Sequence, residues 1–336
     1  MTKNPSIKVG TATVNAGERA TVRLPVADLY TGTSLSMPVH VVCGRREGPV
    51  LFVSAAIHGD ELNGVEIIRR LLKRKALSSM RGTLLAVPIV NVHGFLDQSR
   101  YLPDRRDLNR SFPGSRKGSV AARMAYTFMH EIVDKADFGI DLHTGAINRA
   151  NLPQIRGNLD DEATLQLAKA FGAPVIVNSN VRDGSLRQCA ADKGMPMLIY
   201  EAGEALRFDE LSIRAGLRGT LNAMRHIGML PLSKKTRPVS PVLADSTSWV
   251  RAPESGIVIP RVELGSRVTE GETLAVIGDP VSDEEALVEA PFDGIIIGQS
   301  KLPLAHEGDA LFNVAAFKSV SHAENRVEEF AAVHGA

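Results

Sequence analysis

The sequence predicts an α/β fold with a mostly parallel, doubly wound sheet, followed by a smaller all-β, barrel-like domain. The first observation is a repeated order in which an apolar run is followed by a segment with apolar residues at helical spacing. It starts with "VLFVSAAI" at residues 50–57 and "LNGVEIIRRLLKRK" at residues 62–75. The second is the loss of helical spacing after residue 244, where short β-type runs alternate with Gly, Pro and Asp turns.

The larger domain is expected over residues 46–232, and residues 1–45 are expected to form a β segment associated with it. The expected strands of this domain are 50–57, 83–90, 137–142, 174–177 and 196–201, and its expected helices are 62–75, 119–136, 161–172, 185–194 and 209–230. Ligands of such sheets bind beyond the carboxyl ends of the strands. Polar residues at those ends are therefore the first candidates for a functional site.

The C-terminal part begins after a polar, proline-rich stretch at residues 233–244 that is typical of a linker. Residues 245–320 contain two similar segments, "APESGIVIP" and "APFDGIIIG", as in the quasi-symmetric barrels of biotinyl and lipoyl carriers. Those carriers attach their cofactor to a lysine between the two halves, but residues 271–291 contain no lysine. We therefore expect a structural cap or a partner surface, followed by a charged helical tail at residues 321–336.

Composition and charge argue against several classes of partner. The chain has 336 residues, 44% of them hydrophobic, and a formal net charge of +1. It has no Lys/Arg run interleaved with aromatic residues and no apolar stretch as long as a membrane span, so neither nucleic acid nor membrane is expected as a partner. Two cysteines, Cys43 and Cys189, and the lack of a signal-peptide pattern favour the cytoplasm. Whether the chain forms a homo-oligomer is left open.

A metal site is indicated where the first buried strand ends. His58 and Glu61 lie three residues apart, and a helix starting near Gly59 would project both side chains into the same space. A histidine and a glutamate there make half of a Zn²⁺ site, although Glu61 could instead only complement a helix N-terminus. His143, in "DFGIDLHTG", follows another strand and would complete a His₂Glu set. The alternative for His143 is a hydrogen-bonded core histidine.

Further polar residues follow in a long loop and at a third strand end. Residues 91–114 form a charged loop, and loops this long inside a compact domain are commonly functional. Its Asn109 and Arg110 could hold a substrate carboxylate, because the guanidinium fork matches carboxylate geometry. Glu201 follows the apolar strand "MPMLIY" and is the candidate general base, with Glu204 as its competitor.

In this order, the candidate residues resemble the motifs of the succinylglutamate desuccinylase and aspartoacylase family, a branch of the zinc carboxypeptidase fold. The similarity extends over roughly residues 45–230. It implies these roles: His58, Glu61 and His143 bind Zn²⁺; Asp107 orients a ligand histidine; Asn109 and Arg110 bind the substrate carboxylate; Arg100 polarises the scissile carbonyl; Glu201 is the catalytic glutamate; Arg187 is a further substrate-binding arginine. The spacing from Arg100 to "DLNR" is longer than in aspartoacylases, which puts the role of Arg100 in question.

The resemblance implies a zinc-dependent deacylase with one Zn²⁺ per chain. It would cleave the amide bond of a small, anionic N-acylated amino acid with a metal-activated water and Glu201 as general base. Two alternatives remain: a zinc metallocarboxypeptidase acting on a short peptide or acidic tail, and a non-enzymatic protein that binds zinc or a small molecule. In the β module, His306 is expected in an exposed turn and Trp249 at the domain junction.

Overall fold

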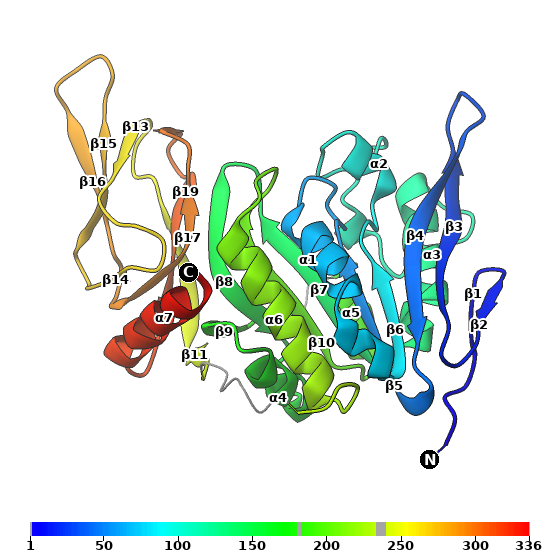
Figure 1. The fold of residues 1–336 in the computed structure, drawn as a ribbon. Coiled ribbons are helices and arrows are strands. Elements are labelled where there is room, and N and C mark those ends of the chain that lie inside the picture. Colours follow the sequence, from blue (N-terminus) through cyan, green and yellow to red (C-terminus); the bar gives the residue numbers. More distant parts are fainter. Residues whose placement is uncertain (1, 180–182, 233–239, 336) are drawn as a thin grey trace.

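The computed structural model describes residues 2–179, 183–232 and 240–335, and its central feature is a sheet of 13 strands within those residues. The main path of this sheet runs β12-β19-β17-β8-β10-β7-β5-β6-β4-β3 (Figure 1). The strands of its larger part are β3 (Arg19–Asp28), β4 (Ser34–Cys43), β5 (Arg46–Ala55), β6 (Arg81–Val87), β7 (Phe138–Gly145), β8 (Arg149–Gly157), β9 (Val175–Asn178) and β10 (Met197–Glu204). The helices are α1 (Asn63–Leu72), α2 (Val92–Leu96), α3 (Val120–Glu131), α4 (Glu162–Phe171), α5 (Leu186–Asp192), α6 (Glu210–His226) and α7 (Val320–Gly335).

The 13-stranded sheet as a whole is mixed, but within residues 46–232, where a mostly parallel sheet was expected, the pairings are parallel except that of β8 with β10. The four central strands β6, β5, β7 and β10 are parallel. On one side β4 and β3 continue the sheet antiparallel, and on the other β8 pairs antiparallel with β10. Near-continuous apolar runs identify only the buried central strands. The hydrophobic pattern therefore does not predict whether the flanking strands run parallel or antiparallel to them.

Helices cover both faces of the central strands, and alternate residues of one strand enter two different cores. In β5, Phe52 packs toward α3 and meets Phe128 edge to face, with ring centroids 5.8 Å apart. Its neighbours Leu51 and Val53 point to the opposite face and join the core formed with α1, α4 and α6. Because strand side chains alternate between faces, a strand buried on both sides has to be apolar throughout.

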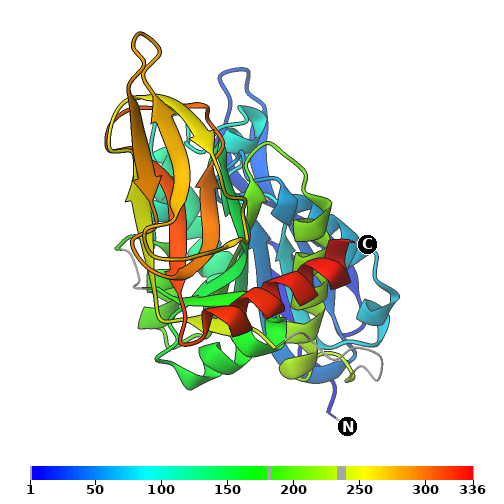
Figure 2. The same ribbon diagram turned by 90° about the vertical axis from the view of Figure 1, so that its left-hand side faces the viewer.

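The C-terminal module is continuous with the main sheet. Its strands β12 (Ser246–Arg251), β14 (Arg267–Val268), β17 (Gly294–Ser300) and β19 (Ala310–Ala316) extend the 13-stranded sheet, because β17 pairs with β8. Strands β13 (Gly256–Pro260), β15 (Thr273–Gly278), β16 (Glu285–Glu289) and β18 (Leu304–Ala305) form a separate four-stranded sheet. The two similar sequence segments therefore contribute β13 to one sheet and β17 to the other (Figures 1 and 2).

The two ends of the module form regular elements, a short strand within the expected linker and a helix where the helical tail was expected. Of the expected linker, residues 233–239 lie outside the described residues, whereas Val242–Ala244 forms β11 and pairs with β9. The tail forms α7, which packs against α6. At the other end of the chain, β1 (Ile7–Val9) and β2 (Ala12–Val14) form a small hairpin.

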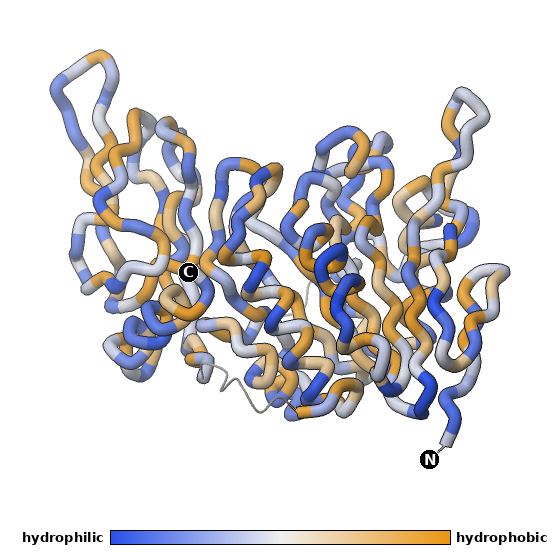
Figure 3. The backbone as a smooth tube through the Cα atoms, in the orientation of Figure 1, coloured by the Kyte–Doolittle hydropathy of each residue, from blue (hydrophilic) through white to orange (hydrophobic). Residues whose placement is uncertain are grey.

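The hydropathy of the backbone follows this architecture. In Figure 3 hydrophobic colour gathers along the central strands, and the loop between β15 and β16 is largely hydrophilic. Within the described ranges, no helix is both long and apolar enough to span a membrane.

Candidate active site

Three potential metal ligands converge at the carboxyl ends of β5 and β7. His58 and Glu61 lie in the turn between β5 and α1, where the Glu61 backbone N–H donates to the His58 carbonyl at 3.1 Å. The helix begins at Asn63, within one residue of the expected start at Leu62, so Glu61 belongs to the turn rather than to the helix. His143 lies within β7, and all three residues are buried. One ligand atom from each residue lies within 4.8 Å of the other two.

Carboxylates on their far sides orient both histidines. His58 Nε2 lies 3.2 Å from Asp107 Oδ1, and His143 Nε2 lies 2.8 Å from Asp141 Oδ2. This leaves both Nδ1 atoms facing Glu61, at 2.6 Å from Oε1 and 2.8 Å from Oε2 respectively. Metal-binding histidines commonly donate their second ring nitrogen to such a carboxylate, which fixes the tautomer and the ring orientation. The donor set of two imidazoles and one carboxylate fits a catalytic zinc site.

The ionisation states of His58, Glu61 and His143 depend on one another. Burial raises the pKa of Glu61, but the charges of His58 and His143 lower it by more, so the carboxylate is ionised far below its ordinary range. Burial lowers the pKa of His143, but Asp141 and Glu61 raise it by more, to well above its ordinary value. A proton on His143 must leave before the nitrogen can bind a metal, so we expect metal affinity to weaken as pH falls.

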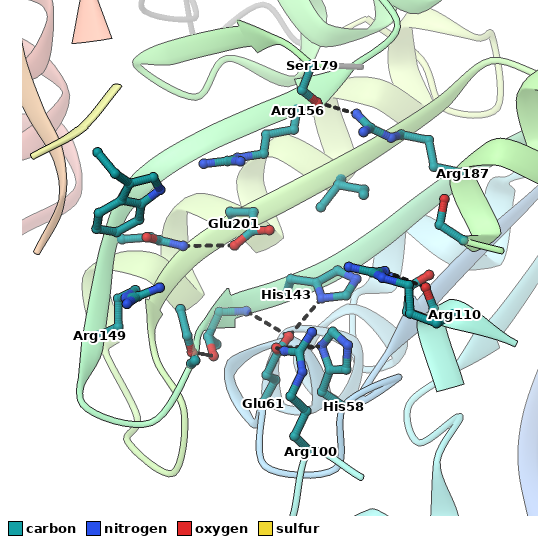
Figure 4. Close-up of a pocket in the computed structure, with 18 residues that line it drawn as sticks. His58, Glu61, Arg100, Arg110, His143, Arg149, Arg156, Ser179, Arg187 and Glu201 are labelled. Carbon is teal, nitrogen blue, oxygen red and sulfur yellow. Dashed lines mark hydrogen bonds and ion pairs between the residues drawn. The ribbon is translucent and has the colours of Figure 1, made fainter. Parts of the chain in front are cut away.

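Arg100 reaches the same cluster from the loop after α2. Its Nη2 donates to Asp107 Oδ2 at 2.9 Å, and its Nη1 lies 3.2 Å from His58 Nδ1 and 3.5 Å from Glu61 Oε1. Figure 4 shows the guanidinium directed at the two ligands. The longer spacing to the following motif therefore does not keep this arginine from the site.

Asn109 and Arg110 line the same pocket from a short 3₁₀ turn, Leu108–Arg110. The buried Asn109 accepts a hydrogen bond from the Leu186 N–H at 3.0 Å, which ties this turn to the start of α5. Arg110 extends toward His143 (Figure 4). Arg187, in α5, lines the same pocket and donates to Ser179 Oγ.

Glu201 lines the same cavity as the three potential metal ligands, from the neighbouring strand. In the register of β10 and β7 it pairs with His143, and both side chains line one cavity of about 430 Å³. Its Oε2 accepts a hydrogen bond from Asn151 Nδ2 at 2.8 Å. Glu204, beyond a break in the strand register, accepts instead from the Asn148 N–H at 3.0 Å and does not line this cavity. The geometry thus favours Glu201 over its competitor.

A family model decides the relationship of this chain to known proteins. Residues 47–227 match the succinylglutamate desuccinylase/aspartoacylase catalytic domain. The chain belongs to this family.

Named relatives of this family member include a deacetylase. This chain is 28% identical to N-alpha-acetyl-L-2,4-diaminobutyric acid deacetylase from Halomonas elongata over 309 residues, which cover 88% of this chain and 90% of the relative. A crystal structure of succinylglutamate desuccinylase/aspartoacylase from Rhodobacter sphaeroides is 26% identical with a TM-score of 0.79, covering 89% of this chain and 96% of that one. The product-bound ectoine utilization protein EutE (DoeB) from Ruegeria pomeroyi shares the fold, with a TM-score of 0.82, 24% identity and coverage of 94% and 100%.

Several residues that line the pocket were not predicted as site residues from the sequence. Strand β8 contributes Arg149, Asn151 and Arg156, and the module contributes Trp249, whose ring lies 4.5 Å from the Arg149 guanidinium carbon. The available signal was the alternation of polar and apolar residues around Pro153, which is typical of a strand with one polar face. Ser179 and Ser185 also line the pocket, and nothing in the sequence distinguishes them.

The histidines set apart from the motifs stay apart from the pocket. His306 is exposed in a turn of the module, where its backbone N–H donates to Asp309 at 2.9 Å. His93, His130 and His226 do not line the cavity either. Trp249 lies at the junction of the two domains, against Arg149 of β8, and its side chain also forms part of the pocket wall.

In the turn that carries His58 and Glu61, the backbone of Gly59 lies very close to the backbone of Gly94. A Cβ there would lie 1.9 Å from the Gly94 carbonyl carbon in α2. We expect Gly59→Ala to lower the free energy of unfolding by about 1–3 kcal/mol, because the backbone must shift to accommodate the methyl group. Urea unfolding would measure this. Gly278→Ala is the matched control, since a Cβ at Gly278 meets nothing within 4 Å; equal stability of the two variants would contradict the prediction.

Proposed function

We propose that this protein is a zinc-dependent deacylase that hydrolyses the amide bond of a small, anionic N-acylated amino acid. The observation that carries the proposal is the convergence of His58, Glu61 and His143 in one cavity with Glu201 on the adjoining strand. Family membership and the deacetylase among its relatives support the same reaction class. Catalysis is assigned to residues 46–232, with residues 245–320 completing one wall of the pocket.

His58 Nδ1, Glu61 and His143 Nδ1 would hold one Zn²⁺ per chain. When bound there, zinc supplies a Lewis acid that polarises the amide carbonyl and acidifies water. Asp107 and Asp141 keep both imidazoles in the tautomer that presents Nδ1 to the metal. The orientation of the donors therefore comes from residues outside the coordination sphere.

Glu201 is assigned as the proton shuttle. It takes a proton from the water that attacks the carbonyl carbon, and it then gives that proton to the amide nitrogen as the amine departs. Asn151 holds one of its oxygens at 2.8 Å, which limits the rotation of the carboxylate. Arg100 donates to the oxygen on which negative charge develops, because its guanidinium already points at the metal cluster. The products are a carboxylic acid and a free amine.

The charge of the pocket supports an anionic substrate. Its lining includes five arginines but only two carboxylates, Glu61 and Glu201. Asn109 and Arg110 are proposed to bind the carboxylate next to the scissile amide, with Arg187 as a further substrate-binding arginine in the same pocket. An arginine excess of this kind attracts anions and repels cationic ligands.

The alternatives differ from this proposal in a measurable way. A metallocarboxypeptidase would hydrolyse short peptides with the same residues, and a binding protein would hydrolyse nothing. We propose an assay of acetyl, succinyl and aspartyl amides of amino acids, including N-acetyl-2,4-diaminobutyrate, beside short peptides. Release of free amine from one or more N-acyl amino acids is the expected result; turnover of peptides alone would overturn the deacylase assignment.

Trp249 offers a direct readout of substrate binding, because it is the only tryptophan in the sequence and it lines the pocket. We expect its fluorescence to change on titration of Glu201→Gln protein with the acyl amino acid that the wild type hydrolyses. In the Glu201→Gln protein, Trp249→Phe should abolish the signal. In a chain that retains Glu201, Trp249→Ala should raise KM about tenfold, by loss of the ring that packs on Arg149. An unchanged KM in Trp249→Ala would place the substrate away from this wall.

A further inference from the structure

A second cavity, of about 440 Å³, lies outside the active site between the outer sides of α1 and α6. Ala76, Leu217 and Leu221 contribute its apolar part. Six cationic side chains surround them: Arg70, Arg74, Lys75, Arg214, Arg218 and Arg225. We call this cavity the basic groove.

Most of the positive charge in the basic groove is uncompensated. Arg70 and Arg214 bond to Glu210, with N–O distances of 2.7 and 3.0 Å. Across the ranges that the structure describes, the remaining four cations, Arg74, Lys75, Arg218 and Arg225, form no ion pair. Arg218 and Arg225 are half-buried, so their charges are less screened by solvent than those of a fully exposed surface. A ligand of this groove has to be anionic.

The hairpin between β15 and β16 carries the opposite charge. Its loop and the start of β16 contain Asp279, Asp283, Glu284 and Glu285, all exposed. In the described part of the chain none of them forms an ion pair, and Asp279 caps its own turn by accepting from the Val281 N–H at 2.7 Å. Val281 is 91% exposed at the tip, which presents an apolar side chain among four carboxylates.

We infer that the acidic hairpin of one copy of this chain docks into the basic groove of a second copy. The four carboxylates equal the four unpaired cations in number and have the opposite charge. Val281 could pack on the apolar part of the groove formed by Leu217 and Leu221. Both views of the molecule show the hairpin projecting from the far end of the C-terminal module, away from α1 and α6, so it does not reach the groove of its own chain (Figures 1 and 2).

A second copy fits these observations better than a small anion. An inorganic anion would use the guanidinium groups but would leave the apolar part of the groove uncovered, whereas the hairpin supplies both kinds of contact. The hairpin also occupies the position where carrier domains bear their lysine, and here it is acidic instead. Because the two surfaces differ, the contact is reciprocated across a two-fold axis, closed into a ring or continued as an open chain of copies.

Charge reversal tests the pairing. The purified full-length protein would be examined by sedimentation velocity at low ionic strength. Wild type is expected to associate, and the association should weaken at least tenfold on addition of salt. Arg74→Glu with Arg218→Glu, or Asp283→Lys with Glu285→Lys, should each give monomers. Arg19→Glu with Arg23→Glu is the matched control, since both residues are exposed on β3 and carry no ion pair within the described ranges.

The decisive variant carries all four reversals of groove and hairpin in one chain. It should associate again, because the two surfaces are complementary once more with their signs exchanged. An equimolar mixture of the two double variants should form complexes, since each retains one native surface. A monomeric wild type, association of either double variant alone, or a monomeric fourfold variant would each overturn the inference. Hydrolytic activity of every variant, measured in parallel, shows that the catalytic part is folded.

Discussion

Replacing Glu201 with glutamine is expected to lower kcat about 10²–10⁴-fold, because the side chain keeps its shape but can no longer accept a proton. The amide oxygen of glutamine can still accept the hydrogen bond from Asn151, so the pocket should keep its geometry. KM should change only a few-fold, and the bound zinc should remain at one per chain. Steady-state hydrolysis of an N-acyl amino acid, with metal analysis of the same sample, measures all three quantities.

Glu204→Gln is the matched control for this substitution. Glu204 lies in the same strand, three residues later, but it bonds to the Asn148 N–H and does not line the cavity. Its replacement should leave kcat within about twofold, because a group outside the cavity has no part in the proton transfer. Loss of activity in Glu204→Gln with retention in Glu201→Gln would transfer the role of general base to the competitor.

Removal of a proposed metal ligand is expected to have the second large effect. His143→Ala should lose zinc at micromolar metal concentrations and lose activity with it, since two ligands alone do not make a stable site. Asp141→Ala should have a smaller effect, about 10–100-fold in zinc affinity. Asp141 does not bind the metal itself but orients the His143 imidazole by bonding to Nε2 of that ring. Competition with a chromophoric chelator would measure both affinities.

His306→Ala serves as the control for the metal variants. His306 is exposed in a turn of the module and lies outside the cavity, so zinc affinity should be unchanged. A variant series in which His143, Asp141 and His306 all behaved alike would contradict the proposed coordination. Zinc affinity of the wild type should also weaken as the pH is lowered, since the raised pKa of His143 makes protons compete with the metal for its nitrogen.

The convergence of the three potential metal ligands was predictable because it depends on local features. An apolar run followed at once by His58 and Glu61 places both residues at a strand end, and His143 does the same for another strand of that sheet. The start of α1 at Asn63 lies within one residue of the helix expected over residues 62–75. The close approach of Gly59 to Gly94 in α2, 35 residues further along the chain, was not predictable, because it depends on tertiary packing.

The far wall of the pocket was not predictable, because it depends on long-range register. Strand β8 carries Pro153 and several polar residues, so no apolar run marks it. Its pairing with β17 joins the C-terminal module to the main sheet and places Trp249 beside Arg149. Local hydrophobic patterns predict that strands exist, but not which of two distant strands will be neighbours.

Activity as a function of added zinc is the most direct test of the central claim. Protein stripped of metal would be titrated with Zn²⁺ while amine release from an N-acyl amino acid is followed. The proposed site predicts no activity without metal and a linear rise that ends at one zinc per chain, and no such rise in His143→Ala. Full hydrolysis in the stripped protein, or absence of amine release at one bound zinc per chain across the acyl amino acids, would contradict it.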